Sequence, residues 1–134
     1  MFGTMRSALI IVTGLLILVS LPHALEDFHY GDLTKIGIAP PYGIAALITA
    51  YVIQLTGIDL TLRSRPWGIW LLGGMGVIWC LGAVVIHGHD LLFAGPHYRH
   101  GSISRLLEVA IIGLGLMAAV ISMLMRKASP TRRD

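Results

Sequence analysis

The residues of this 134-residue chain that are best suited to chemistry gather in two short polar segments. The first contains His23, Glu26, Asp27 and His29, and the second contains His87, His89, Asp90, His97 and His100. These nine residues include every histidine of the chain. Imidazole and carboxylate groups are ligands that proteins offer to zinc, copper and iron. The two segments are therefore a candidate metal site, with copper, zinc or iron as the candidate ion and these nine side chains as candidate ligands. The alternative is that they are solvated residues at helix ends or contacts with partner subunits, because such groups prefer water to lipid.

The spacing in the first segment suits one face of a helix. Residues three and four positions apart are neighbours on a helix surface. If the helix before His23 continues, His23, Glu26 and Asp27 share a face, with His29 one turn further. Glu26 and His29 also form a Glu-x-x-His spacing. Four-helix proteins with paired metals use two such motifs, and this chain has one, so that family is not indicated.

A haem or chlorophyll is an alternative ligand for two of the histidines. His23 and His87 end the first and third apolar segments of the chain. Bis-histidine haem takes one imidazole from each of two neighbouring helices, so this pair is the candidate for binding a haem or a chlorin. Covalent haem attachment is excluded, because Cys80 is the single cysteine and no Cys-x-x-Cys-His motif exists.

One acid stands deeper in an apolar segment than any other. Glu108 lies about a turn and a half into the last apolar segment, and Arg105 precedes it by three residues. A carboxylate within a membrane span is a functional candidate by default. The spacing also predicts an ion pair between Glu108 and Arg105, which would be structural.

The elements that position these residues are four apolar segments. The chain is 55% hydrophobic and only 13% charged, whereas a soluble domain has about 25% charged residues. A helix of about 20 apolar residues crosses the bilayer core, and only helices satisfy their backbone there. We predict one domain, an all-α transmembrane bundle of four helices, running up-down-up-down. The predicted spans are 7–25, 42–59, 67–86 and 103–125, with outer loops 26–41 and 87–102.

The placement of lysine and arginine predicts the orientation. Seven of the ten lie on the side of the two termini, namely Arg6, Arg63, Arg65, Arg126, Lys127, Arg132 and Arg133. Basic residues favour the cytoplasmic side. We therefore expect cytoplasmic termini, a multi-pass protein of the inner (cytoplasmic) membrane, and histidine segments that face the periplasm. The first segment resembles a signal peptide, but its cleavage pattern is poor, and a retained helix is expected.

Three functions are compatible with these features. The first, favoured by small size and glycine-rich segments, is an auxiliary subunit of a larger respiratory, photosynthetic or monooxygenase complex, without catalytic activity of its own. The second is a protein that binds or transfers a transition metal on the periplasmic side. The third is a proton-coupled transporter or membrane enzyme that acts as a homo-oligomer, with Glu108 in the path. The expected partners are lipid and other membrane subunits. Nucleic acid is excluded, because the basic residues flank apolar segments.

Overall fold

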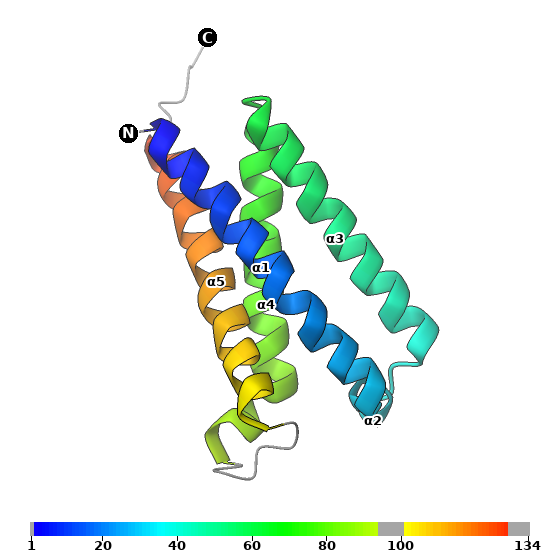
Figure 1. The fold of residues 1–134 in the computed structure, drawn as a ribbon. Coiled ribbons are helices and arrows are strands. Elements are labelled where there is room, and N and C mark those ends of the chain that lie inside the picture. The colour runs from blue at the N-terminus through cyan, green and yellow to red at the C-terminus, as the bar shows by residue number, and fades with distance from the viewer. Residues whose placement is uncertain (1, 94–100, 129–134) are drawn as a thin grey trace.

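A computed structural model of the chain describes residues 2–93 and 101–128, all of them in helices or short connections. The helices are α1 (Phe2–Tyr30), α2 (Asp32–Lys35), α3 (Pro40–Leu62), α4 (Pro66–Phe93) and α5 (Gly101–Ala128). The four long helices run alternately up and down (Figure 1). The start of α1, the turn between α3 and α4 and the end of α5 share one end of the bundle, here called the terminal end. The opposite end is called the site end.

The four long helices are long and apolar enough to cross a membrane, which confirms this part of the sequence prediction. Their outer surfaces carry large apolar side chains along most of their length, as Leu18, Val85 and Ile103 illustrate with exposed fractions of 68%, 82% and 71%. A soluble monomer rarely exposes contiguous apolar surface of this extent. Lipid accommodates such side chains, so length, composition and surface all indicate a multi-pass membrane protein.

The helices extend beyond the apolar spans predicted from the sequence, especially at the site end. α1 continues to Tyr30 and α4 to Phe93. Residues 26–30 and 87–93 are therefore helical, and the predicted outer loops 26–41 and 87–102 are wrong at these positions. Hydropathy marks where a helix leaves the apolar layer. It does not mark where the helix ends, because a polar residue can remain helical when it packs inside the bundle. The predicted loop 26–41 also contains the short helix α2.

Two local features set the turn between α1 and α3. Gly31 takes a left-handed backbone conformation with φ of 69°, which glycine adopts without the steric cost of a side chain. This residue separates α1 from α2. Pro40 and Pro41 then occupy the first positions of α3, where a proline lacks only an N–H that has no helical partner. The second long helix therefore begins two residues before the predicted span 42–59.

Packing in the bundle is uneven. α5 lies along both α1 and α4, whereas α3 packs mainly along α4. Two small apolar clusters fill the interior. Leu9, Leu72 and Met125 belong to the cluster nearer the terminal end, and Leu16 and Ile111 belong to the one nearer the site end. The interior is narrow, so polar side chains that point inward from different helices come close to one another.

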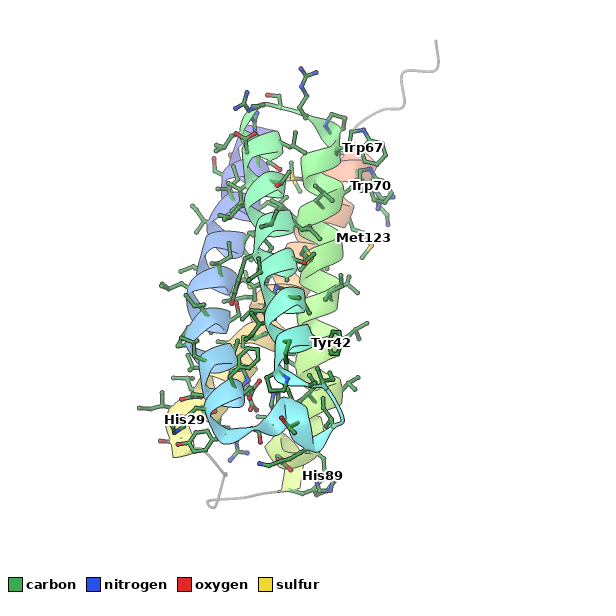
Figure 2. The ribbon with its side chains drawn as sticks, turned by 90° about the vertical axis from the view of Figure 1, so that its right-hand side faces the viewer. His29, Tyr42, Trp67, Trp70, His89 and Met123 are labelled. Carbon is green, nitrogen blue, oxygen red and sulfur yellow. The ribbon has the colours of Figure 1, made fainter. Side chains whose placement is uncertain are left out.

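Aromatic side chains mark the terminal end of the bundle. Trp67 and Trp70 lie near the start of α4 and point outward (Figure 2). The guanidinium of Arg126 lies over the Trp70 ring, 3.1 Å from its centroid. Tryptophan beside basic residues is common at the membrane–water interface. His29 and His89 lie at the opposite end (Figure 2), so the bundle separates a tryptophan-rich end from a histidine-rich one.

Candidate metal centre

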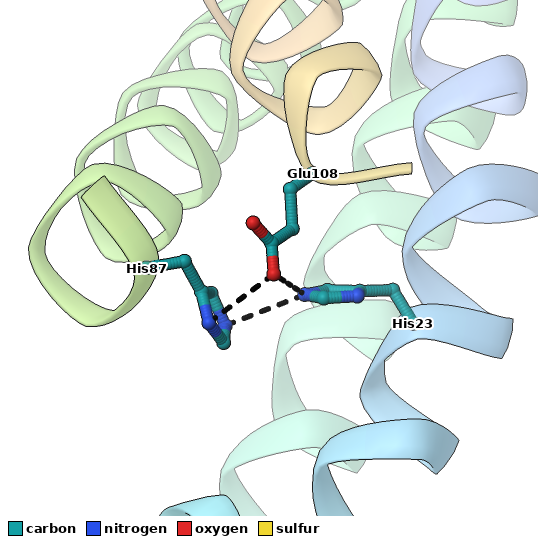
Figure 3. Close-up of side chains that lie close together, drawn as sticks. All are labelled: His23, His87 and Glu108. Atoms are coloured by element: carbon teal, nitrogen blue, oxygen red, sulfur yellow. Dashed lines mark hydrogen bonds and ion pairs between the residues drawn. The ribbon is translucent and has the colours of Figure 1, made fainter. Parts of the chain in front are cut away.

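Three helices bring a buried polar group together at the site end. His23 comes from α1, His87 from α4 and Glu108 from α5, and their side chains point toward one another (Figure 3). All three are almost completely buried, with exposed fractions of 4%, 2% and 0%. Each offers one nitrogen or oxygen atom, and these atoms all lie within 4.8 Å of one another. This group could hold a metal ion.

Antiparallel helices explain why residues so distant in sequence reach the same depth. His87 lies six residues before the end of α4, and Glu108 lies seven residues after the start of α5. His23 lies seven residues before the end of α1. Because the helix rises about 1.5 Å per residue, all three stand at a similar distance from the site end. Their faces then meet where α5 packs between α1 and α4.

Asp27 completes the group from the same face of α1 as His23. Its Oδ2 lies 3.4 Å from His87 Nε2 and 3.8 Å from His23 Nε2, and the two Nε2 atoms are 3.3 Å apart. Donor atoms that surround a zinc ion tetrahedrally at about 2.0–2.1 Å lie about 3.4 Å from one another. The triangle of His23 Nε2, His87 Nε2 and Asp27 Oδ2 therefore has the size of one face of a metal coordination shell.

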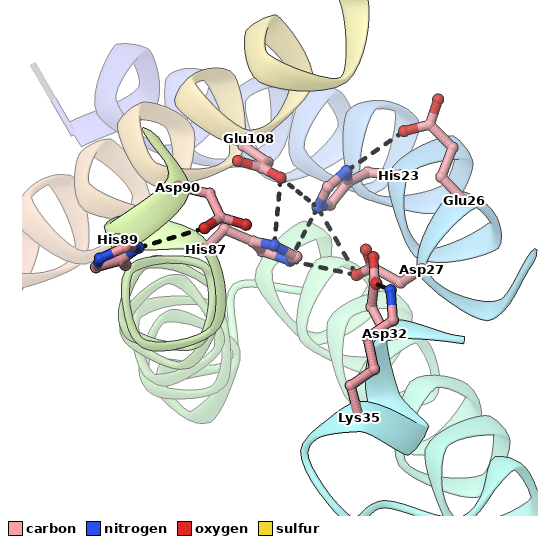
Figure 4. A network of polar contacts seen from close by, with 9 residues as sticks. All are labelled: His23, Glu26, Asp27, Asp32, Lys35, His87, His89, Asp90 and Glu108. Atoms are coloured by element: carbon pink, nitrogen blue, oxygen red, sulfur yellow. Dashed lines mark hydrogen bonds and ion pairs between the residues drawn. The ribbon is translucent and has the colours of Figure 1, made fainter. Parts of the chain in front are cut away.

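The remaining nitrogen of each imidazole faces a second carboxylate (Figure 4). His87 Nδ1 lies 3.3 Å from Glu108 Oε1, and His23 Nδ1 lies 3.7 Å from Glu26 Oε2. Metal-binding histidines commonly present their second nitrogen to a carboxylate, which fixes the ring orientation and raises the basicity of the ligand. Glu108 Oε1 is also 3.7 Å from His23 Nε2, so this carboxylate is near both rings.

The donor set restricts the chemistry of the site. It consists of imidazole nitrogens and carboxylate oxygens, which suit zinc, iron, copper(II) or manganese, and it contains no thiolate to favour copper(I). The two imidazole rings meet nearly at right angles, with an interplanar angle of 69° and ring centroids 4.9 Å apart. A bis-histidine haem needs its macrocycle between the two nitrogens. With those nitrogens 3.3 Å apart, the arrangement fits a single ion better than a haem or chlorin.

Two of the other candidate histidines lie on the exposed surface of the helices and not in this group. His29 and His89 are exposed, and His89 Nδ1 lies 3.4 Å from Asp90 Oδ1. His97 and His100 lie outside the described residues. The sequence analysis places all nine candidate ligands together at the outer end of the bundle. A helix turns by about 100° per residue, so His87 and His89 point in different directions although only one residue separates them.

Glu108 lies beside the two buried histidines, a contact that the sequence does not predict. Its Oε1 is 3.7 Å from His23 Nε2 and 3.3 Å from His87 Nδ1, and the ion pair expected with Arg105 stays a prediction. Arg105 is exposed, and it donates a hydrogen bond to the backbone oxygen of Leu91 at 2.9 Å. Glu108 was singled out in the sequence as a membrane-embedded acid but was not placed with the histidines. One signal in the sequence could have predicted this contact. His87 and Glu108 lie at similar sequence distances from the polar segment between the last two apolar segments, so they are expected at a similar depth in neighbouring helices.

Comparison with protein-family models, with curated proteins and with solved structures finds no match for this chain.

Proposed function

We propose that this protein is an integral membrane protein that binds one divalent transition-metal ion between α1, α4 and α5. The observation that carries the proposal is the triangle of His23 Nε2, His87 Nε2 and Asp27 Oδ2, whose sides of 3.3–3.8 Å match the spacing of donors around a metal ion. Glu26 and Glu108 are assigned the role of orienting the two imidazoles. Zinc, iron and copper(II) are the candidate ions.

Burial supports this proposal. Charged and polar groups are expensive within a membrane bundle, and those present are usually paired with one another or functional. Here two imidazoles and the carboxylates of Asp27 and Glu108 are buried together. A divalent cation would offset the charge of the two carboxylates and would justify an arrangement that is costly without one.

The distribution of basic residues supports a location on the outer side of the membrane. Seven of the ten lysines and arginines lie at the terminal end in the predicted topology, and basic residues favour the cytoplasm. We infer that the site end faces the periplasm of a bacterial inner membrane. A protein in this orientation would take up or pass on a metal from the periplasmic side.

The decisive experiment compares two histidines of α4. The protein is purified in mild detergent, stripped with a chelator, dialysed against Co²⁺ or Zn²⁺, and analysed for bound metal. Wild type and His89→Ala should each bind one ion per chain, because the His89 side chain is 83% exposed and lies outside the site. His87→Ala should lose this stoichiometric binding, since His87 provides a corner of the triangle. A metal-free wild type, or equal binding by His87→Ala, would refute the proposal.

The other two functions make different predictions. An auxiliary subunit should co-purify with a larger assembly when the native protein is gently extracted. The glycines that favoured this hypothesis include Gly76 and Gly115, which pack against each other within the chain. A proton-coupled transporter should lose activity with Glu108→Gln although the bundle still assembles. In the metal-binding proposal, Glu108→Gln weakens metal binding and does not abolish it.

A further inference from the structure

A cavity adjoins the buried histidines on the side of α3. It has a volume of about 270 Å³ and is lined by residues of all four long helices. Its wall is mainly apolar and includes Ile78, Trp79, Ala83 and Ile111. Pockets that bind small molecules commonly start at about 300 Å³ and combine an apolar wall with a few polar groups. This cavity has the size and lining for a compact apolar ligand.

The polar part of the wall is the proposed metal triangle itself. His23, Asp27 and His87 line the cavity, whereas Glu108 is not among the lining residues. An ion held by the three lining side chains would therefore have protein on one side and the cavity on the other. Metal sites with three protein ligands and an open position are typical of centres that bind an exogenous ligand, while structural sites are closed by four.

Part of the cavity wall lies on the outer, apolar surface of the bundle. α3 and α4 are close at the turn that joins them and diverge toward the site end (Figure 1). Ala46 of α3 and Ile78 and Gly82 of α4 line the cavity in this diverging region. Ala46 is exposed, and Ile78 is 60% exposed on the outer surface of a membrane-spanning helix. A molecule dissolved in the lipid could therefore reach the metal triangle from the side.

We propose that the cavity binds a neutral, lipid-soluble molecule that presents one hydroxyl or carbonyl oxygen to the metal ion. This inference rests on the proposed function, because the ion supplies the group that the oxygen would contact. The apolar wall accepts a hydrocarbon ring or chain, and Trp79 offers an aromatic surface. Asp27, Glu108 and Glu26 surround the ion with three carboxylates. Their combined negative charge disfavours anionic ligands such as phosphate or carboxylate head groups.

A larger side chain at Gly82 should fill the cavity. This glycine lines the cavity, and a Cβ atom placed on it would have nothing within 4 Å, so Gly82→Leu should place its side chain in open space. Gly113 of α5 is the matched control, because it is exposed and a Cβ there also meets nothing within 4 Å. Gly113 is not among the residues that line the cavity. Ala46→Leu fills the same cavity from α3.

The test uses the detergent-solubilised protein loaded with Co²⁺, whose visible spectrum reports changes in coordination. Metal analysis first establishes whether each variant holds one ion, which tests the proposed function separately. The loaded proteins are then titrated with 4-ethylphenol, a neutral apolar probe, and with 4-hydroxyphenylacetate, its charged counterpart. Wild type and Gly113→Leu should show a saturable spectral change with 4-ethylphenol. Gly82→Leu should require at least about tenfold more probe, a loss of about 1.4 kcal/mol in binding free energy.

Each result decides a different point. A Co²⁺-loaded wild type whose spectrum does not respond to 4-ethylphenol would overturn the ligand inference while the metal proposal stands. Equal responses from wild type and Gly82→Leu would also overturn it, since the ligand would then lie elsewhere. If Gly82→Leu fails to hold Co²⁺, Ala46→Leu takes its place with the same expectation. A wild type that binds no metal would overturn both proposals.

Discussion

Gly76 of α4 and Gly115 of α5 lie against each other where the two helices cross. A Cβ atom on Gly76 would stand 2.6 Å from the backbone oxygen of Gly115, and one on Gly115 would stand 2.7 Å from the backbone oxygen of Gly76. Only glycine fits on either side of this contact. The close approach of α4 and α5 is also what brings His87 and Glu108 within 3.3 Å. The crossing and the site are therefore structurally linked.

Gly76→Ala should destabilise the bundle and weaken metal binding. The added methyl group meets backbone atoms that cannot move aside, so the helices must separate, at a cost of about 1–3 kcal/mol for such overpacking. Separation would also move His87 away from Glu108. Unfolding by denaturing detergent measures the first effect, and Co²⁺ titration measures the second.

Gly74→Ala is the control for this substitution. Gly74 is exposed on the same helix, and a Cβ there would have nothing within 4 Å. Replacing this glycine should leave metal affinity unchanged and raise helix stability by up to about 1 kcal/mol. Equal behaviour of the two variants would show that the Gly76–Gly115 contact does not determine the geometry of the site.

Asp27 and Glu26 should differ in their effects on metal binding although they are adjacent in sequence. Asp27 provides an oxygen of the triangle, so Asp27→Asn should alter the spectrum of bound Co²⁺ and greatly reduce affinity. The Glu26 carboxylate instead lies 3.7 Å from the outer nitrogen, Nδ1, of His23. Glu26→Gln should preserve the spectrum and lower affinity by about 10- to 100-fold, as loss of an orienting carboxylate does. An altered spectrum in Glu26→Gln with an unchanged one in Asp27→Asn would reverse the assigned roles.

The sequence predicts the helices of this protein better than its site. Four long apolar segments leave helices as the only spanning structures, so their number follows from hydropathy and backbone hydrogen bonding. The spacing of His23 and Asp27 also places both on one face once α1 is known to continue. Hydropathy could not predict where the helices end, because the polar residues at the site end remain helical inside the bundle.

The partners of these residues depend on which faces meet, and hydropathy does not contain this information. Glu108 has an arginine three positions away, which local spacing favours as its partner, and only helix packing brings its carboxylate beside His23 and His87. The same packing separates His87 from His89, which look equivalent in the sequence. The cavity beside the site is lined by residues of all four long helices, so it depends on their packing, which no local pattern records.

A hydrogen bond deep in the bundle should contribute measurably to stability. Trp79 Nε1 donates to Gln54 Oε1 at 3.0 Å, and Gln54 is completely buried. A double-mutant cycle of Gln54→Leu and Trp79→Phe should give a coupling energy of about 0.6 kcal/mol and no more than about 1.7 kcal/mol, the range for interhelical hydrogen bonds in membranes. Unfolding by denaturing detergent measures the stability of the wild type, the two single variants and the double variant. A coupling energy of zero would mean that the pair contributes only packing.

The predicted orientation can be tested with single cysteines at the two ends. The chain has one cysteine, Cys80, which is half-buried, so Cys80→Ala gives a background without thiols. Ser64→Cys then marks the terminal end in the turn between α3 and α4, and His89→Cys marks the site end, both at exposed positions. The excess of lysine and arginine at the terminal end predicts that a membrane-impermeant thiol reagent labels His89→Cys in intact cells. Ser64→Cys should react only after the membrane is permeabilised. The opposite pattern would place the metal site on the cytoplasmic side and would exclude uptake of a metal from the periplasm through this end of the bundle.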